Sequence, residues 1–131
     1  LFYGDYSYIK NKKDDISVNN LLPQKINLLY NLIDLYIVSS KSEGGPKQIL
    51  ESALTKTLIF STNVGLAPDF LHPNLIFNKE NLNELIEKIY QFIKSPKSFT
   101  NYLDYNYQKT ISEMNEDLLI KKYRNVISEN L

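Results

Sequence analysis

Short apolar runs that alternate with helical patterns constrain the fold of this chain more than any other feature. The run LYIV at residues 35–38 and the run LIF at 58–60 are rich in aliphatic and aromatic side chains, which is typical of strands buried on both faces of a parallel sheet. Residues 46–56 between them have helical spacing. The strand–helix–strand order predicts an α/β domain with a doubly wound parallel sheet and helices on both faces. The helical side chains expected to face inward are Ile49, Leu50, Ala53 and Leu54.

Three further apolar runs, at residues 1–3, 16–18 and 75–77, are strand candidates. Residues 6–15 fit either a short helix or a loop. Residues 61–74 are expected to form a long loop, because glycine and proline punctuate them. Pro23 can occupy the first position of a helix. The inward residues of that helix are Ile26, Leu29, Tyr30 and Ile33.

The C-terminal part of the chain is predicted to be helical. Asn81 and Glu84 form a capping-box pattern at the start of a helix over 81–95, and Pro96 ends it. A second helix is expected over about 99–114, and a third begins at Asn115. The inward stripe of the first of these helices comprises Leu82, Leu85, Ile86, Ile89 and Ile93. That of the last comprises Leu119, Tyr123, Val126 and Ile127.

The composition of the chain argues against several classes of function. The 131 residues suffice for one domain, and their formal net charge of zero argues against a nucleic-acid-binding surface. The chain has no cysteine and a single histidine, His72, so neither a disulfide framework nor a cysteine or histidine metal site is expected. No apolar run approaches the roughly 20 residues of a transmembrane helix. We expect a cytoplasmic protein without a transmembrane segment.

The two loops with the most glycine, proline and polar residues follow the strands at 35–38 and 58–60. In parallel sheets, ligands bind beyond the carboxyl ends of the strands. The first loop leads into the sequence EGGPK at residues 43–47. Gly44 and Gly45 let a ligand approach the backbone, and Pro46 suits the first helical position. The amides that follow, at Lys47 and Gln48, point out of a helix N-terminus that favours phosphate.

Glu43 precedes this turn, and Glu51 follows it one turn into the helix. An ionised carboxylate only accepts hydrogen bonds, so it suits neutral hydroxyl groups such as those of a sugar. A phosphate site between two such carboxylates matches the ribose, diphosphate and hexose of a nucleotide sugar. On residue type alone, the two glutamates could equally be helix-start carboxylates stabilised by the helix dipole. Lys47 could be a solvated lysine.

The stretch LIDLYIVSSKSEGGPKQILESALTKTLIFSTNVGLAPDFL resembles the donor-binding half of family 4 glycosyltransferases of the GT-B fold. That family has an acidic residue before a buried strand, then serine, an E-x7-E element that opens a helix, and a T-x-V-G-x-x-P-(D/E) loop after the next strand. The matching residues here are Asp34, Ser40, Glu43, Gly44, Glu51 and the segment 62–69. The resemblance implies a Rossmann-like C-terminal half of a GT-B fold that ends in helices.

The resemblance also implies roles for individual residues. Glu43 would contact the donor sugar near the reacting centre and act in catalysis, and Glu51 would hold the ribose. Backbone amides over 45–47 would hold the diphosphate, with Ser40, Gly44 and Pro46 beside them. The base would lie near Asn19, largely on backbone groups. The donor would be a UDP-, GDP- or ADP-sugar, the transfer would mostly retain anomeric configuration, and no bound metal would be needed.

The chain departs from the family in three respects. Lys56-Thr57-Leu58 replaces a common Gly-x-Pro, and Asn20 replaces a common glycine. The family's basic pair and acceptor-binding N-terminal domain have no counterpart in residues 1–131. We therefore expect a single donor domain of a hexosyltransferase that is inactive alone. Its full-length form is expected to use a glycan or lipid acceptor, with peripheral contact at the inner face of a membrane. The alternative is a non-catalytic nucleotide-binding module. A dinucleotide-binding oxidoreductase is excluded, because no G-x-G-x-x-G follows the first strand.

Overall fold

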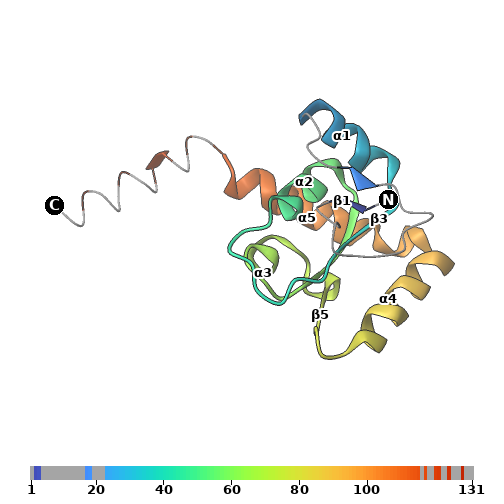
Figure 1. The fold of residues 1–131 in the computed structure, drawn as a ribbon. Coiled ribbons are helices and arrows are strands. Elements are labelled where there is room, and N and C mark those ends of the chain that lie inside the picture. Colours follow the sequence, from blue (N-terminus) through green and yellow to red (C-terminus); the bar gives the residue numbers. More distant parts are fainter. Residues whose placement is uncertain are drawn as a thin grey trace.

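The strands in the described part of the chain form two parallel sheets. The computed structural model describes residues 2–3, 17–18 and 23–115, together with positions 117, 120, 121, 124 and 128. A two-stranded sheet pairs β1 (Phe2–Tyr3) with β2 (Ser17–Val18). A three-stranded sheet has the order β3 (Leu35–Val38), β4 (Leu58–Thr62), β5 (Ile76–Phe77). Every pairing is parallel, as the strand–helix alternation predicted (Figure 1).

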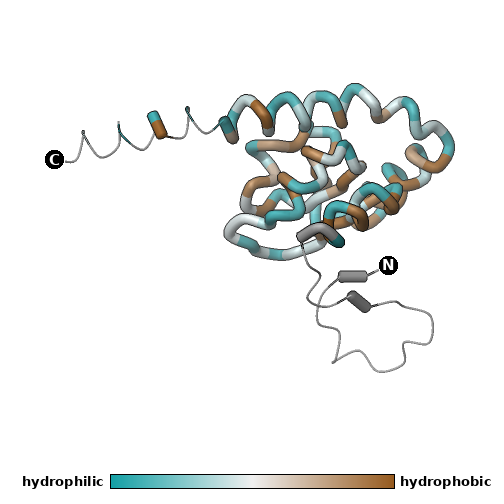
Figure 2. Tube along the Cα trace, turned by 90° about the horizontal axis from the view of Figure 1, so that it is seen from above, coloured by the Kyte–Doolittle hydropathy of each residue, from teal (hydrophilic) through white to brown (hydrophobic). Residues whose placement is uncertain are grey.

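Helices cover both faces of the three-stranded sheet, as predicted. On one face Ile59 belongs to a buried cluster with Ile49 of α2 (Lys47–Thr55). On the other face Phe60 packs with Phe99, and α4 (Leu82–Lys94) adds Ile89 to that cluster. Along the helices, the tube in Figure 2 alternates between apolar and polar segments, as expected of helices that bury one side. Two further helices of the described part are α1 (Pro23–Leu32) and α5 (Thr100–Glu113).

The expected loop over residues 61–74 is more ordered than its composition suggested. β4 extends to Thr62, and the short helix α3 (Ala67–Phe70) and the 3-10 helix η1 (Pro73–Leu75) follow. The amides of Phe70 and Leu71 donate to the carbonyls of Leu66 and Ala67. Burial of Ala67, Phe70 and Leu71 in the first cluster holds this turn in place, so tertiary packing overrode the proline and glycine signals.

The prediction that residues 35–38 are buried on both faces is wrong at Ile37, which is 40% exposed. Among the described strands, β3 lies at the edge of the three-stranded sheet and pairs only with β4. The cluster around Phe60 reaches Leu35 on the same face but does not extend to Ile37. An edge position therefore leaves one side of the strand's outer end uncovered.

Helix α4 starts at the predicted cap but with half of the predicted capping box. The Asn81 side chain accepts a hydrogen bond from the Glu84 amide at 3.3 Å. The Glu84 carboxylate accepts from the Asn78 amide at 3.2 Å, while the Asn81 amide donates to the Asn78 carbonyl. In a complete capping box, the Glu84 carboxylate would accept from the Asn81 amide. Here it accepts from the Asn78 amide, three residues earlier.

The predicted inward stripe of α4 is only partly correct. Leu85 and Ile89 pack against the cluster around Phe60, together with Phe92. The other three stripe residues are exposed, namely Leu82, Ile86 and Ile93. A helix on the outside of one sheet buries a single face, and the sequence of α4 carries more apolar side chains than that face accommodates.

The C-terminal end of α2 closes without glycine. Lys56 has φ 53°, in the left-handed region that favours glycine, and its amide and that of Thr57 bond back to the last turn of the helix. Its ammonium group contacts Asp104 of α5 at 2.7 Å; the two helices lie side by side in Figure 1. The departure from the family's Gly-x-Pro thus lies at the opposite end of α2 from the glycine turn. Leu54 was expected inward but is exposed, and Ser52 is buried instead.

Some predictions lie outside the described residues. They concern the segment 6–15, Asn19, Asn20 and the inward stripe of the last helix. Positions 117, 120, 121, 124 and 128 are helical. No helix in the described part of the chain has the length and apolar character needed to cross a bilayer.

Candidate functional site

The loops after β3 and β4 lie against each other. Gly65 has φ +49°, and a Cβ atom there would stand 2.7 Å from the Pro46 ring and 2.9 Å from the Glu43 carbonyl oxygen. No real Cβ atom fits at such distances, so glycine is required by both its conformation and its surroundings. The V-G segment of the second loop therefore supports the E-G-G-P turn of the first.

A buried hydrogen bond fixes the start of the first loop. The Thr62 hydroxyl, at the end of β4, donates to the Ser40 carbonyl oxygen at 2.7 Å. Thr62 is almost fully buried, so its hydroxyl needs this partner. Ser40 is thus tied to the neighbouring strand through its backbone, and its side chain remains partly exposed.

Helix α2 begins one residue later than predicted. Pro46 is extended (φ −64°, ψ 113°) and caps the helix, so that Lys47 is its first helical residue. The Ile49 amide donates to the Pro46 carbonyl. The amides of Lys47 and Gln48 make no hydrogen bond to another described residue and remain available at the positive end of the helix. Pro46 therefore precedes the helix and is not its first residue, and phosphate binding at this helix start stays a prediction.

The space in front of the glycine turn is open. A Cβ atom at Gly44 would meet no atom of the described chain within 4 Å, and one at Gly45 would only touch the Leu66 side chain at 3.7 Å. Neither glycine has a positive φ. Neither steric crowding nor backbone conformation explains the two glycines. Glu43 is exposed beside them, and its carboxylate has no ion pair or hydrogen bond with another described residue.

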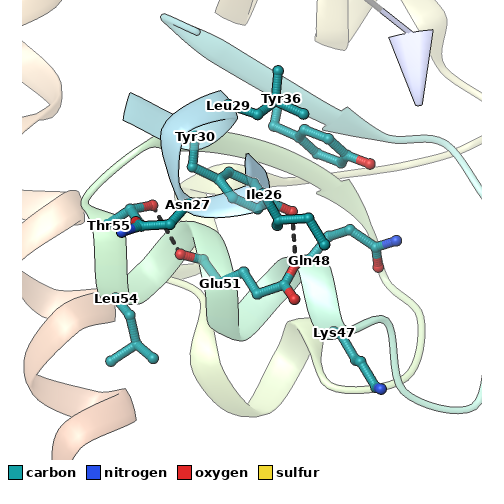
Figure 3. A pocket seen from close by; sticks show the side chains of 10 residues that line it. All are labelled: Ile26, Asn27, Leu29, Tyr30, Tyr36, Lys47, Gln48, Glu51, Leu54 and Thr55. Atoms are coloured by element: carbon teal, nitrogen blue, oxygen red, sulfur yellow. Dashed lines mark hydrogen bonds between the residues drawn. The ribbon is translucent and has the colours of Figure 1, made fainter. Parts of the chain in front are cut away.

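Glu51 lies in a pocket between α1 and α2. The pocket has a volume of about 500 Å³. The Tyr30 hydroxyl of α1 donates to Oε2 of Glu51 at 3.0 Å, and the Thr55 hydroxyl donates to the Glu51 carbonyl at 2.8 Å (Figure 3). Of the predicted site residues, Lys47 and Glu51 share this pocket. Its lining comprises Ile26, Asn27, Leu29, Tyr30, Tyr36, Lys47, Gln48, Glu51, Leu54 and Thr55.

Tyr30 enters the site as a hydrogen-bond donor. Burial, and next the negative charge of Glu51, raise the pKa of the Tyr30 hydroxyl above its ordinary value. It therefore stays protonated at neutral pH. Helical spacing had placed Tyr30 inward but had not named it as a site residue. A signal was present, because a tyrosine on a buried helix face normally finds a partner for its hydroxyl.

The predicted residues thus fall into two adjoining groups. Lys47 and Glu51 line the pocket, whereas Glu43, Gly44, Gly45 and Pro46 form the turn that leads into α2. A second pocket of about 570 Å³ lies at the carboxyl ends of β4 and β5, lined among others by Lys41, Asn63 and Lys79. Among the described residues, no three His, Cys, Asp or Glu side chains gather where they could hold a metal ion. Donor binding without metal stays a prediction.

Comparison with known proteins places this site within one family. The family model described as "Glycosyl transferases group 1" matches residues 7–110. The match includes both loops, all of α2 and both glutamates. No curated protein matches the chain significantly, and no solved structure does either.

Proposed function

Because the chain belongs to the group 1 glycosyltransferases, we propose that it binds the nucleotide-sugar donor of an enzyme that transfers a hexose to a glycan or lipid acceptor. The donor is a UDP-, GDP- or ADP-sugar, and the transfer retains anomeric configuration. One observation carries the proposal. Glu51 lines a pocket of about 500 Å³ directly beside the glycine turn that starts α2.

The start of α2 suits the diphosphate. The amides of Lys47 and Gln48, which bond to no other described residue, lie at the positive end of the helix dipole, where anions are favoured. Gly44 leaves open space in front of the turn, so phosphate oxygens can approach the backbone. The Lys47 side chain lines the adjoining pocket and adds a positive charge.

The pocket suits the ribose. Glu51 is one turn into the helix, and one of its oxygens already accepts a hydrogen bond from Tyr30. The other oxygen can accept from ribose hydroxyls, since an ionised carboxylate needs donors. Apolar and aromatic side chains form much of the remaining wall, which is typical of sites for small ligands.

The exposed Glu43 suits the donor sugar. It precedes the glycine turn in sequence, whereas Glu51 follows it, and the hexose of a donor would lie near it once the diphosphate sits at the helix start. A carboxylate there faces the anomeric centre, on which positive charge develops as the bond to the diphosphate breaks. The developing negative charge on the leaving group is stabilised by the amides of the turn.

The diphosphate should contribute more to affinity than the base. We expect UDP, GDP or ADP to bind the 131-residue protein at least tenfold more tightly than the matching nucleoside, because the helix start recognises the phosphates. Isothermal titration calorimetry with both members of each pair measures this ratio. Equal affinities would remove the phosphate site from the proposal.

Replacing Glu51 with glutamine should weaken nucleotide binding. Glutamine keeps an acceptor for Tyr30, but it loses the charge that strengthens hydrogen bonds from ribose. Such a bond contributes about 1.5–3 kcal/mol, so affinity for nucleoside diphosphate should fall by roughly ten- to a hundredfold. In the full-length enzyme KM should rise and kcat should hardly change.

The matched control for this prediction is Glu87→Gln, which makes the same chemical change at an exposed position of α4. Its affinity should equal that of the unmodified protein. The assignment of Glu51 is wrong if Glu51→Gln and Glu87→Gln bind nucleoside diphosphate equally well.

A further inference from the structure

We propose that Tyr30 is a positioning residue that fixes the Glu51 carboxylate, and through it makes the pocket selective for ribonucleotides over 2′-deoxyribonucleotides. This inference rests on the proposed function. It begins with the hydrogen bond of 3.0 Å from the Tyr30 hydroxyl to Oε2 of Glu51, which joins α1 to α2 across the pocket. In Figure 3 the tyrosine hydroxyl lies over the glutamate side chain.

Tyr30 is itself firmly placed. Its side chain is buried, with 4% of the residue exposed. The Thr57 hydroxyl donates to its carbonyl oxygen at 2.8 Å, and its ring packs against the Tyr36 ring with centroids 5.7 Å apart. The hydroxyl is therefore held at one point of the pocket wall. Because it remains protonated, it acts on Glu51 only as a donor.

Among the described residues, the Glu51 side chain has no comparable support besides Tyr30. The Thr55 hydroxyl contacts its main-chain carbonyl, which does not restrain the side chain. Within the described part of the chain, Tyr30 is the hydrogen-bond partner of the carboxylate. A glutamate side chain has three rotatable bonds, and fixing such a side chain costs conformational entropy. The hydrogen bond from Tyr30 restricts the Glu51 side chain already in the free protein. Less conformational entropy is then lost when the ligand binds, which is how preorganisation increases affinity.

The orientation has a consequence for ligand choice. With Oε2 engaged by Tyr30, Oε1 and the remaining lone pairs are directed to ligand donors. A ribose offers two adjacent hydroxyl groups, whereas a 2′-deoxyribose lacks one. A site built to bind a hydroxyl group rejects an analogue without it, because the buried acceptor is left unpaired. Discrimination between the two sugars therefore depends on how well the carboxylate is held.

The test compares Tyr30→Phe with the unmodified protein in titrations of UDP and 2′-deoxy-UDP, and of the corresponding GDP and ADP pairs. We expect the unmodified protein to prefer the ribonucleotide by roughly tenfold, the value of one such hydrogen bond. Tyr30→Phe should lose most of this preference, because the ribonucleotide weakens by roughly fivefold or more while the deoxyribonucleotide changes little. Tyr102→Phe is the matched control. It removes a hydroxyl that accepts from Asn74 at 2.9 Å on another part of the fold, and the preference should remain.

A double-mutant cycle separates positioning from a structural role. If Tyr30 acts through Glu51, Tyr30→Phe should have no further effect on affinity in a Glu51→Gln protein, whereas independent effects would add. The double variant also replaces the charged carboxylate with a neutral amide, so that no charge is left without its tyrosine donor should Tyr30→Phe alone fold poorly. An unchanged ribonucleotide preference in Tyr30→Phe, or additive effects in the cycle, would overturn the inference while leaving the proposed function intact. If the unmodified protein binds none of the nucleotides, the proposed function fails and this inference fails with it.

Discussion

Replacing Glu43 with glutamine should lower kcat of the full-length enzyme by more than about a hundredfold, the scale of one lost transition-state contact. The exposed carboxylate of Glu43 lies beside the glycine turn, where the donor hexose is proposed to lie. A negative charge there stabilises the positive charge that develops at the anomeric carbon, so it is worth more in the transition state than in the ground state. Affinity for free nucleoside diphosphate, which lacks the hexose, should barely change.

Steady-state kinetics with UDP-glucose, GDP-mannose and ADP-glucose, together with calorimetry on the matching diphosphates, measures both quantities. Glu51→Gln provides the counterpart, since it should lower affinity and spare kcat. Two results would show that the glutamates have been assigned wrongly. One is a Glu43→Gln enzyme that keeps its kcat, and the other is a loss of diphosphate affinity equal to that of Glu51→Gln. If the unmodified enzyme turns over no donor although it binds diphosphate, the non-catalytic alternative is correct.

Replacing Gly65 with alanine should destabilise the protein by about 2 kcal/mol or more. A left-handed conformation costs a non-glycine residue roughly 1–2 kcal/mol, and forcing an extra methyl group into a packed site costs about 1–3 kcal/mol. The new Cβ would stand 2.7 Å from the Pro46 ring and 2.9 Å from the Glu43 carbonyl oxygen. The E-G-G-P turn must move to relieve these contacts, so nucleoside diphosphate should also bind more weakly. Urea denaturation and calorimetry measure the two effects.

Gly44→Ala is the control for the Gly65 prediction. It adds the same methyl group to the same pair of loops, but where no atom of the described chain lies within 4 Å. Its free energy of unfolding should stay within about 0.5 kcal/mol of the unmodified protein, as for most surface substitutions. Equal stability of Gly65→Ala and Gly44→Ala would mean that the loops do not press together as described.

The sequence alone was sufficient for the strands at 35–38 and 58–60, the helix between them and the helix after Asn81. These elements follow from local properties, namely β-branched and aromatic runs, helical periodicity and capping residues, which act within a few neighbouring positions. The placement of the two loops beside each other followed as well, because the carboxyl ends of parallel strands lie at one edge of a sheet. The role of Glu51 in donor binding stays a prediction.

Tertiary structure decided the features that depend on residues distant in sequence. Ile37 is exposed because β3 pairs only with β4 among the described strands, and Leu82 and Ile86 are exposed because α4 buries only one face. Local periodicity identifies which side chains share a face, but not which neighbour covers that face. Burial by such a neighbour also made a short helix of residues 67–70.

The same division holds within the site. Residue types and spacing determined that two carboxylates flank a glycine turn at a helix start, because these relations lie within nine consecutive residues. Only the folded chain brought Tyr30 of α1 to Glu51 of α2, and Gly65 of the second loop against Glu43 and Pro46 of the first. Both contacts depend on the packing of separate elements to within an ångström, and no pattern of neighbouring residues encodes that distance.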